Sequence, residues 1–147
     1  MTTEPDPAAP SGVVVGVDGS RAGTAALHWA ADTAATYQAP LTIVFARPDV
    51  EGDVVEAEQE EQLLDRSACD VREHQPELVV TDVRVRFRHG RGRPAGILVD
   101  EAHGCALAVV GARGLGGFVG LLMGSVSQQV LAHADCPVAV VRPPVSE

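Results

Sequence analysis

Runs of consecutive apolar residues alternate along this chain with segments in which apolar residues recur at helical spacing. Continuous apolar runs rich in β-branched residues are typical of strands that are covered on both faces of a sheet. Four such runs are present, over 13–17, 41–47, 106–110 and 137–142. A further strand is predicted over 78–88, where apolar and charged residues alternate. Helices are predicted between the strands, over 22–37, 94–103 and 125–133. One more helix, between the second and third strands, is predicted to end at about residue 74.

Alternating strands and helices force parallel pairing through right-handed crossovers, so we expect an α/β fold. The five strands would form one doubly wound parallel sheet with helices on both faces. Val83, Val85 and Phe87 share one face of the third strand and charged residues share the other, which indicates an edge strand. The natural strand order is then 3-2-1-4-5. It places the reversal of winding between strands one and four, where ligands of such sheets bind and where Asp18 and Gly111 fall.

The pattern also predicts which helix faces are buried. The first helix would be capped by Ser20 or a neighbour and would bury one side that carries Ala26, Trp29, Ala30 and Thr33. The helix over 94–103 has its own apolar face, formed by Ala95, Leu98, Val99 and Ala102.

Length and charge limit the classes of protein that this chain can be. With 147 residues it fits a single domain, which we place at 12–143, between a proline-rich disordered tail over 1–11 and a short tail over 144–147. The formal net charge of -9 argues against general binding to nucleic acid or to anionic membranes. We therefore interpret the arginines between Arg84 and Arg93 as the solvated face of the edge strand. No apolar run is long enough to cross a bilayer and no signal core is present, so a cytoplasmic location is expected.

The cysteine and lysine content excludes several chemistries. The three cysteines, Cys69, Cys105 and Cys136, lack metal-ligand spacing and are expected to be reduced, partly buried side chains. No metal site is predicted from the cysteines and histidines. All eleven basic residues are arginines, so the lysine of a P-loop cannot be present.

A glycine-rich segment follows the fourth strand. Gly111 and Gly114 can adopt positive φ and allow backbone amides to approach phosphates closely, and Gly124 permits a second close approach. Ser125 and Ser127 then start a helix, whose free N–H groups and dipole form an anion site without lysine. Asp18 would accept hydrogen bonds from ribose hydroxyls or lie near a magnesium ion on the phosphates. In the alternative interpretation, Asp18 caps the first helix and the glycines form tight turns.

The spacing G-x2-G-x9-G-[ST], followed by VSQQVLAHADCPVAVVR, resembles the nucleotide-binding signature of the universal stress protein family. The similarity covers nearly the whole chain, including VGVDGS, ALHWA, GRPAGILVDEA and the CPV that opens the last strand. The resemblance implies a Rossmann-like domain of the adenine nucleotide α-hydrolase type that binds ATP, typically as a dimer, with a role in stress or dormancy signalling. Ala106 and Ala112 depart from residues that are common in the family.

The resemblance also implies the ligand contacts. Adenosine would be held by Gly16, Val17, Asp18 and the backbone at Ala46, with Val110 near the adenine. Arg113 is a further candidate that would reach a phosphate or lie in solvent. The phosphate contacts would be Gly111, Gly114, Gly124, Ser125, Val126 and Ser127.

Our leading functional hypothesis is therefore an ATP-binding regulatory module, with ATP, AMP or ADP as ligand and Mg²⁺ on the phosphates. The motif supplies a cradle and Asp18, but no charge clamp, so we name no catalytic residue and expect at most slow ATP hydrolysis. A slow ATPase and a nucleotide-free dimeric interaction protein are the alternatives. The first loop lacks the S-G-G-x-D-S pattern of ATP pyrophosphatases. The apolar strand Pro137 to Arg142 would lie at a sheet edge, which predicts a homodimer through that edge.

Overall fold

A computed structural model describes residues 12–18, 20–48, 57–78, 83–90, 94–112 and 124–143. The strands are β1 (Val13–Val17), β2 (Leu41–Pro48), β3 (Val83–Gly90), β4 (Leu107–Gly111) and β5 (Val138–Val141). The helices are α1 (Arg21–Tyr37), α2 (Ala57–His74), α3 (Pro94–Ala102) and α4 (Ser125–His133). Every predicted strand and helix has a counterpart, although β3 begins later than residue 78. The expected tails, Arg113 and Gly114 lie outside the described residues. Within those residues, no helix combines the length and apolar character needed to cross a membrane.

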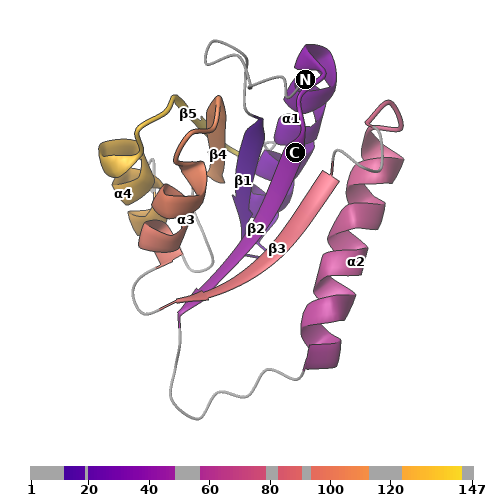
Figure 1. Ribbon diagram of the computed structural model, residues 1–147, viewed down its shortest axis with the longest axis horizontal. Coiled ribbons are helices and arrows are strands. Elements are labelled where there is room, and N and C mark those ends of the chain that lie inside the picture. Colours follow the sequence, from indigo (N-terminus) through magenta and orange to yellow (C-terminus); the bar gives the residue numbers. More distant parts are fainter. Residues whose placement is uncertain are drawn as a thin grey trace, which may run out of the picture.

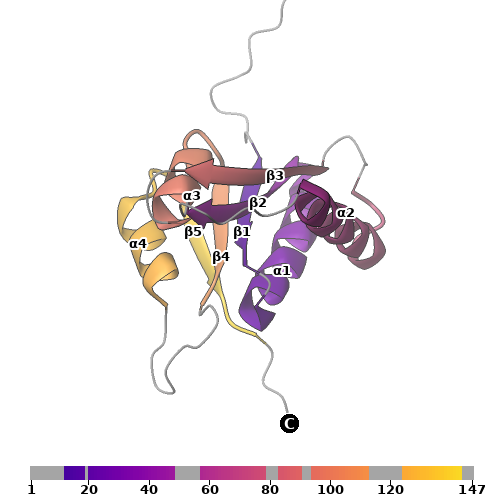
Figure 2. The same cartoon turned by 90° about the horizontal axis from the view of Figure 1, so that it is seen from below.

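The strands form one parallel sheet in the order β3-β2-β1-β4-β5, which coincides with the expected order. Figures 1 and 2 show α1 and α2 on one face of this sheet and α3 and α4 on the other. The prediction of an α/β fold with a parallel sheet and helices on both faces is confirmed. β3 and β5 are the two edge strands.

The central strand β1 contributes to two separate cores because its successive side chains point to opposite faces. Val13 and Val15 pack with α1 against Leu41 and Ile43. Val14 packs on the other face with residues of α3 and α4. This double burial explains why the β1 segment is a continuous apolar run.

Helix α1 begins as the sequence suggested but buries a different stripe. The Oγ of Ser20 accepts a hydrogen bond from the Gly23 N–H at 3.0 Å, so Ser20 is the N-cap. The expectation that Trp29 lies on the buried face is wrong, since 41% of it is exposed. Thr33 is only half-buried. Small residues allow the helix to approach the sheet closely and leave the indole at its flank. The buried residues of α1 are Ala22, Gly23, Ala26, Leu27, Ala30, Ala31 and Ala34.

The three cysteines differ in environment. Cys69 is exposed, contrary to expectation, whereas Cys105 and Cys136 are half-buried beside the core that faces α3 and α4. Burial raises the pKa of the Cys105 thiol above its ordinary value of 9.0, and the nearby Cys136, Glu101 and Asp135 raise it further. Burial and Asp135 likewise raise the pKa of Cys136, although a hydrogen bond from Ala108 opposes them. Among the described residues, no cluster of His, Cys, Asp and Glu could hold a metal ion.

These environments predict an order of alkylation. A raised pKa leaves a smaller fraction of reactive thiolate at a given pH, so Cys105 and Cys136 should react with iodoacetamide near neutral pH more slowly than exposed Cys69. Their rates should continue to rise as the pH passes 9.0, because the pKa of each thiol lies above that value. Site-resolved mass spectrometry over a pH series measures the order. A Cys105 rate equal to that of Cys69 at neutral pH would contradict it.

Candidate functional site

The carboxyl ends of β1 and β4 lie next to each other at the centre of the sheet. The two strands pair in register, with Val15 beside Val109, and Val17 and Gly111 follow two residues later. The chain leaves β1 for α1 on one face and reaches α4 on the other face after β4 (Figure 2). This arrangement is a topological switch point, at the position that the sequence suggested.

Gly111 is required here because a helix lies against it. A Cβ at this position would lie 2.7 Å from the carbonyl carbon and 2.8 Å from the carbonyl oxygen of Ala22, in the first turn of α1. Gly111 does not use a left-handed conformation, since among the described glycines only Gly12 and Gly104 have positive φ. The interpretation of Gly111 as a positive-φ turn is therefore wrong. The close approach places the N-terminus of α1 directly over the end of β4.

The start of α4 is attached to the end of β4 by two contacts with one carbonyl group. The Gly124 N–H donates to the Ala112 oxygen at 2.5 Å. The Ser127 Oγ lies 3.1 Å from the same oxygen and 2.9 Å from the Gly124 oxygen. Ser127 is 2% exposed, and its hydroxyl is already hydrogen-bonded to the backbone of the protein. A ligand at this position would therefore contact the backbone amide of Ser127 and not its hydroxyl.

The first turn of α4 presents backbone donors. Gly124 is the N-cap and provides no side-chain cap hydrogen bond. The N–H groups of Ser125, Val126 and Ser127 have no acceptor within the helix, because the first N–H groups of an α-helix lack a preceding carbonyl partner. Together with the positive end of the helix dipole, these amides can bind an anion.

Asp18 lies in the turn between β1 and α1. It is exposed, and its Oδ1 accepts a hydrogen bond from the Ser20 N–H at 2.9 Å. A Cβ at Gly23 would lie 2.9 Å from the same oxygen, so glycine here lets the Asp18 carboxylate lie close to the first turn of α1. Ser20 rather than Asp18 accepts from the helix, and the alternative that Asp18 caps α1 is wrong.

The remaining predicted contacts lie on different sides of the sheet. Val17 packs on the side of α1, whereas Val110 is 4% exposed and packs on the side of α3 and α4. A Cβ at Gly16 would lie 2.7 Å from Leu98, so Gly16 allows α3 to approach β1. Ala46 follows Phe45 near the end of β2 and pairs with Arg88 of β3. The structure thus brings Gly16 to Asp18 beside Gly111, but it buries the Val110 side chain in the core.

A pocket of about 560 Å³ opens beside these strand ends, between α1 and α2. Its lining combines apolar and polar side chains, as ligand pockets do. Of the predicted site residues, it contains only Val17. The contribution of α2 to the pocket was not predicted from the sequence, although Arg66, Asp70 and Glu73 recur at helical spacing along one face of this helix. The lining residues are Val17, Thr24, Leu27, Phe45, Arg66, Ser67, Cys69, Asp70 and Glu73.

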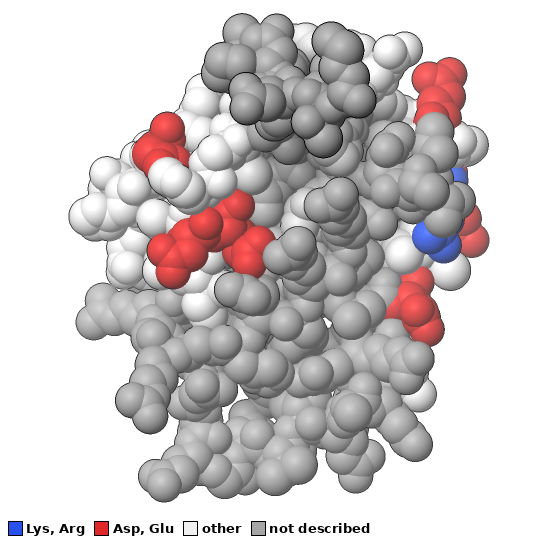
Figure 3. Space-filling view, viewed as in Figure 1, with Lys and Arg blue, Asp and Glu red and all other residues white. Residues whose placement is uncertain are grey.

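The chain as a whole carries a formal net charge of -9. Among the described residues, Figure 3 shows acidic side chains both over α3 and α4 on the left and over α2 on the right, and basic side chains at the right edge. A negatively charged ligand would therefore depend on local donors such as the α4 amides rather than on a positive surface.

The doubly wound parallel sheet places this chain among the α/β domains, a class in which ligands commonly bind at the switch point. Comparison with known proteins gives the family. Residues 12–142 match the model of the universal stress protein family, and the chain belongs to this family.

Individual relatives agree with the assignment. A universal stress protein of Mycolicibacterium smegmatis is 40% identical over 89% of this chain and 45% of its own length. One of Mycobacterium tuberculosis is 37% identical over 88% of this chain and 44% of its own. The chain thus spans about half the length of these curated relatives. A crystal structure of a universal stress protein in complex with cAMP is 27% identical, with a TM-score of 0.70, over 92% of this chain and 100% of its own.

The close approach at the switch point predicts an asymmetric response to added methyl groups. Gly111→Ala should lower the free energy of unfolding by about 1–3 kcal/mol, because the new Cβ would overlap the Ala22 backbone. Gly96→Ala is the matched control, since no described atom lies within 4 Å of its Cβ position in α3, and it should be neutral or stabilising by up to about 1 kcal/mol. Chemical denaturation measures both. Equal stability of the two variants would contradict the packing role of Gly111.

Proposed function

We propose that this chain is an ATP-binding universal stress protein domain that acts as a nucleotide-dependent regulatory module in stress or dormancy responses. The observation that carries the proposal is the start of α4. Its N-cap, Gly124, makes no side-chain cap hydrogen bond, and its first turn is fastened through Ala112 to the end of β4. In the proposed arrangement, the backbone amides of this turn form an anion site at the switch point of the parallel sheet. The nucleotide-binding domain would span residues 12–143.

Two further observations support an adenine nucleotide. The family member whose crystal structure contains cAMP, an adenine nucleotide, shares the fold over 92% of this chain. The pocket beside Val17 has an apolar floor that includes Leu27 and Phe45, next to the strand ends where Ala46 and Asp18 lie. In the proposed arrangement, the phosphates contact the segment from Gly111 to Ser127 and the adenosine contacts Gly16 to Asp18 and the Ala46 backbone. Mg²⁺ would accompany the phosphates near Asp18.

The proposal is one of binding rather than of catalysis. The chain contains no lysine, and the proposed site would hold phosphates with backbone amides, with Asp18 near them only through Mg²⁺. Rapid phosphoryl transfer requires a charge clamp on the leaving group, so we expect hydrolysis of bound ATP to be slow at most. The alternative is a nucleotide-free interaction protein, and the next experiment distinguishes it from the proposed function.

A proline substitution isolates the amide donors of α4. Ser125→Pro removes one proposed phosphate donor at the first helical position, where proline is compatible with an α-helix. Gly124 has φ -78° and ψ 173°, an extended conformation that suits the residue before a proline. Loss of a hydrogen bond to a charged phosphate should weaken ATP binding by about tenfold or more.

Ser125→Ala is the matched control, since it removes the exposed hydroxyl but keeps the N–H, and it should bind ATP more tightly than Ser125→Pro. Calorimetric titration with ATP, AMP and cAMP measures the affinities. Thermal unfolding without ligand checks that both variants fold. Wild-type protein that binds none of the three nucleotides would contradict the proposed function, and so would Ser125→Pro with wild-type affinity.

We further propose that the protein forms a homodimer through β5. All four residues of this strand are half-buried although it lies at the edge of the sheet. The carbonyls of Pro137 and Val141 accept hydrogen bonds from β4. Because successive residues of a strand point their backbone groups to opposite sides, the N–H groups of Val138 and Val140 point away from β4, toward the free edge. A second copy could pair with these groups.

Val140→Pro should therefore shift the protein toward monomer, because it removes one outward N–H without breaking the bonds to β4. Val140→Ala keeps that N–H and serves as the control for the lost side chain. Light scattering after size-exclusion chromatography at micromolar concentration measures the mass of each variant. A monomeric wild type, or a dimeric Val140→Pro, would contradict dimerisation through this edge.

A further inference from the structure

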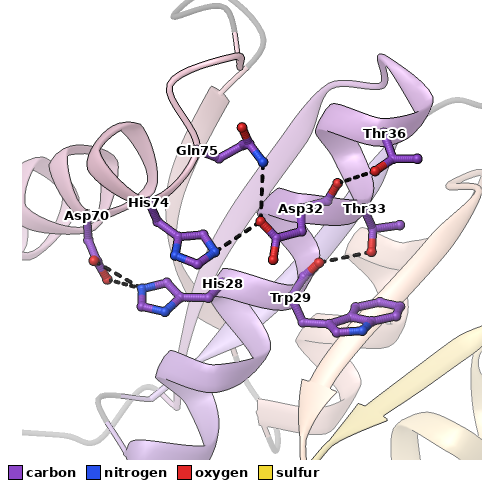
Figure 4. A network of polar contacts seen from close by, with 8 residues as sticks. All are labelled: His28, Trp29, Asp32, Thr33, Thr36, Asp70, His74 and Gln75. Carbon is purple, nitrogen blue, oxygen red and sulfur yellow. Dashed lines mark hydrogen bonds and ion pairs between the residues drawn. The ribbon is translucent and has the colours of Figure 1, made fainter.

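Two histidine–aspartate pairs join α1 to α2 (Figure 4). The His28 Nε2 lies 3.1 Å from both carboxylate oxygens of Asp70. The His74 Nε2 lies 3.0 Å from the Asp32 Oδ1, which also accepts from Gln75 at 3.3 Å. The two imidazole rings stack between the carboxylates, with centroids 4.1 Å apart and planes within 7° of parallel. Each histidine thus donates to the carboxylate of the other helix.

The order of these residues makes the pairing sensitive to register. On α1 the histidine comes first and the aspartate follows four residues later, whereas on α2 the aspartate precedes the histidine by four residues. Residues four apart lie on the same helix face. A shift of α2 by one turn would bring His28 opposite His74 in one direction, or Asp32 opposite Asp70 in the other. Only the observed register places unlike groups opposite each other.

The same face of α2 forms the outer wall of the pocket. Asp70 lines the pocket together with Arg66 and Glu73, and it accepts from His28 on its other side. His28, Asp32 and His74 are not among the lining residues. The neighbouring Val71 is fully buried and anchors α2 to the core. The histidine–aspartate pairs therefore fix which α2 side chains face the pocket.

We propose that His28, Asp32 and His74 form a register lock that positions α2 as the wall of this pocket. The pairs are half-open to solvent, with side-chain exposures of 32% and 40% for His28 and Asp70 and 33% and 55% for His74 and Asp32. Pairs of this exposure contribute little to overall stability, so their effect is on geometry. His28, Asp32 and His74 are therefore positioning residues. They act on the pocket through Asp70, Arg66 and Glu73, which line it. Its effect on a ligand rests on the proposed nucleotide function.

A charge-swap cycle between Asp32 and His74 tests the lock, because neither residue lines the pocket. His74→Asp places two carboxylates opposite each other, and Asp32→His places two imidazoles opposite each other. The double variant Asp32→His with His74→Asp restores one imidazole opposite one carboxylate. Amide hydrogen exchange over residues 62–78, followed by mass spectrometry without ligand, is the first measurement. The affinity for ATP is the second.

We expect each single variant to exchange several-fold faster over 62–78 and to bind ATP several-fold more weakly, and the double variant to recover most of both losses. His103→Ala is the control, because it removes another exposed histidine–aspartate contact, with Asp135, far from α1 and α2 in the fold. It should leave the exchange of 62–78 unchanged. Unchanged exchange in both single variants, or a double variant no better than the singles, would overturn the lock.

Faster exchange with wild-type ATP affinity in the single variants would overturn the positioning role, since the wall would then loosen without consequence for the ligand. Failure of the wild type to bind ATP has a different meaning. It contradicts the proposed function, while the exchange comparison still decides whether the pairs hold the register of α2.

Discussion

The contact between the first turn of α1 and the end of β4 determines how the rest of the site is arranged. Gly111 and Ala22 approach so closely that the helix backbone occupies the space that a side chain at Gly111 would need. Because α1 begins over β4 rather than beyond it, the turn that contains Asp18 and Ser20 lies at the switch point. The same strand end carries Ala112, whose carbonyl holds the start of α4. Two helix N-termini are thereby directed to one edge of the sheet.

Convergence of helix N-termini explains how an acidic chain without lysine can provide an anion site. The net charge of -9 offers no long-range attraction for phosphate. Backbone amides bind an anion without a compensating side-chain charge, provided that they are rigidly oriented. Ser127 supplies that rigidity with a hydroxyl that is buried and hydrogen-bonded to the backbone. In this site a serine of the motif supports the backbone instead of facing solvent.

The fold could be predicted from the sequence because its signals are local. Continuous apolar runs marked the buried strands, and the alternation near Val83 and Val85 marked an edge strand. Ser20 was recognised as a cap for the same reason. The side chain of Trp29 was misplaced because burial depends on how closely a neighbouring element approaches, and spacing along the chain does not contain that distance. The α2 wall of the pocket was missed because its polar residues resemble an ordinary solvated helix face.

The exposure of Trp29 has a practical consequence for spectroscopy of this protein. It is the single tryptophan of the chain, and it lies at the flank of α1 next to His28, 41% exposed, rather than in either core. Intrinsic fluorescence will therefore report the outer surface of α1. Emission from the folded state should already be red-shifted and accessible to aqueous quenchers. Unfolding should therefore shift the emission maximum only slightly, so circular dichroism is the better probe of the two cores.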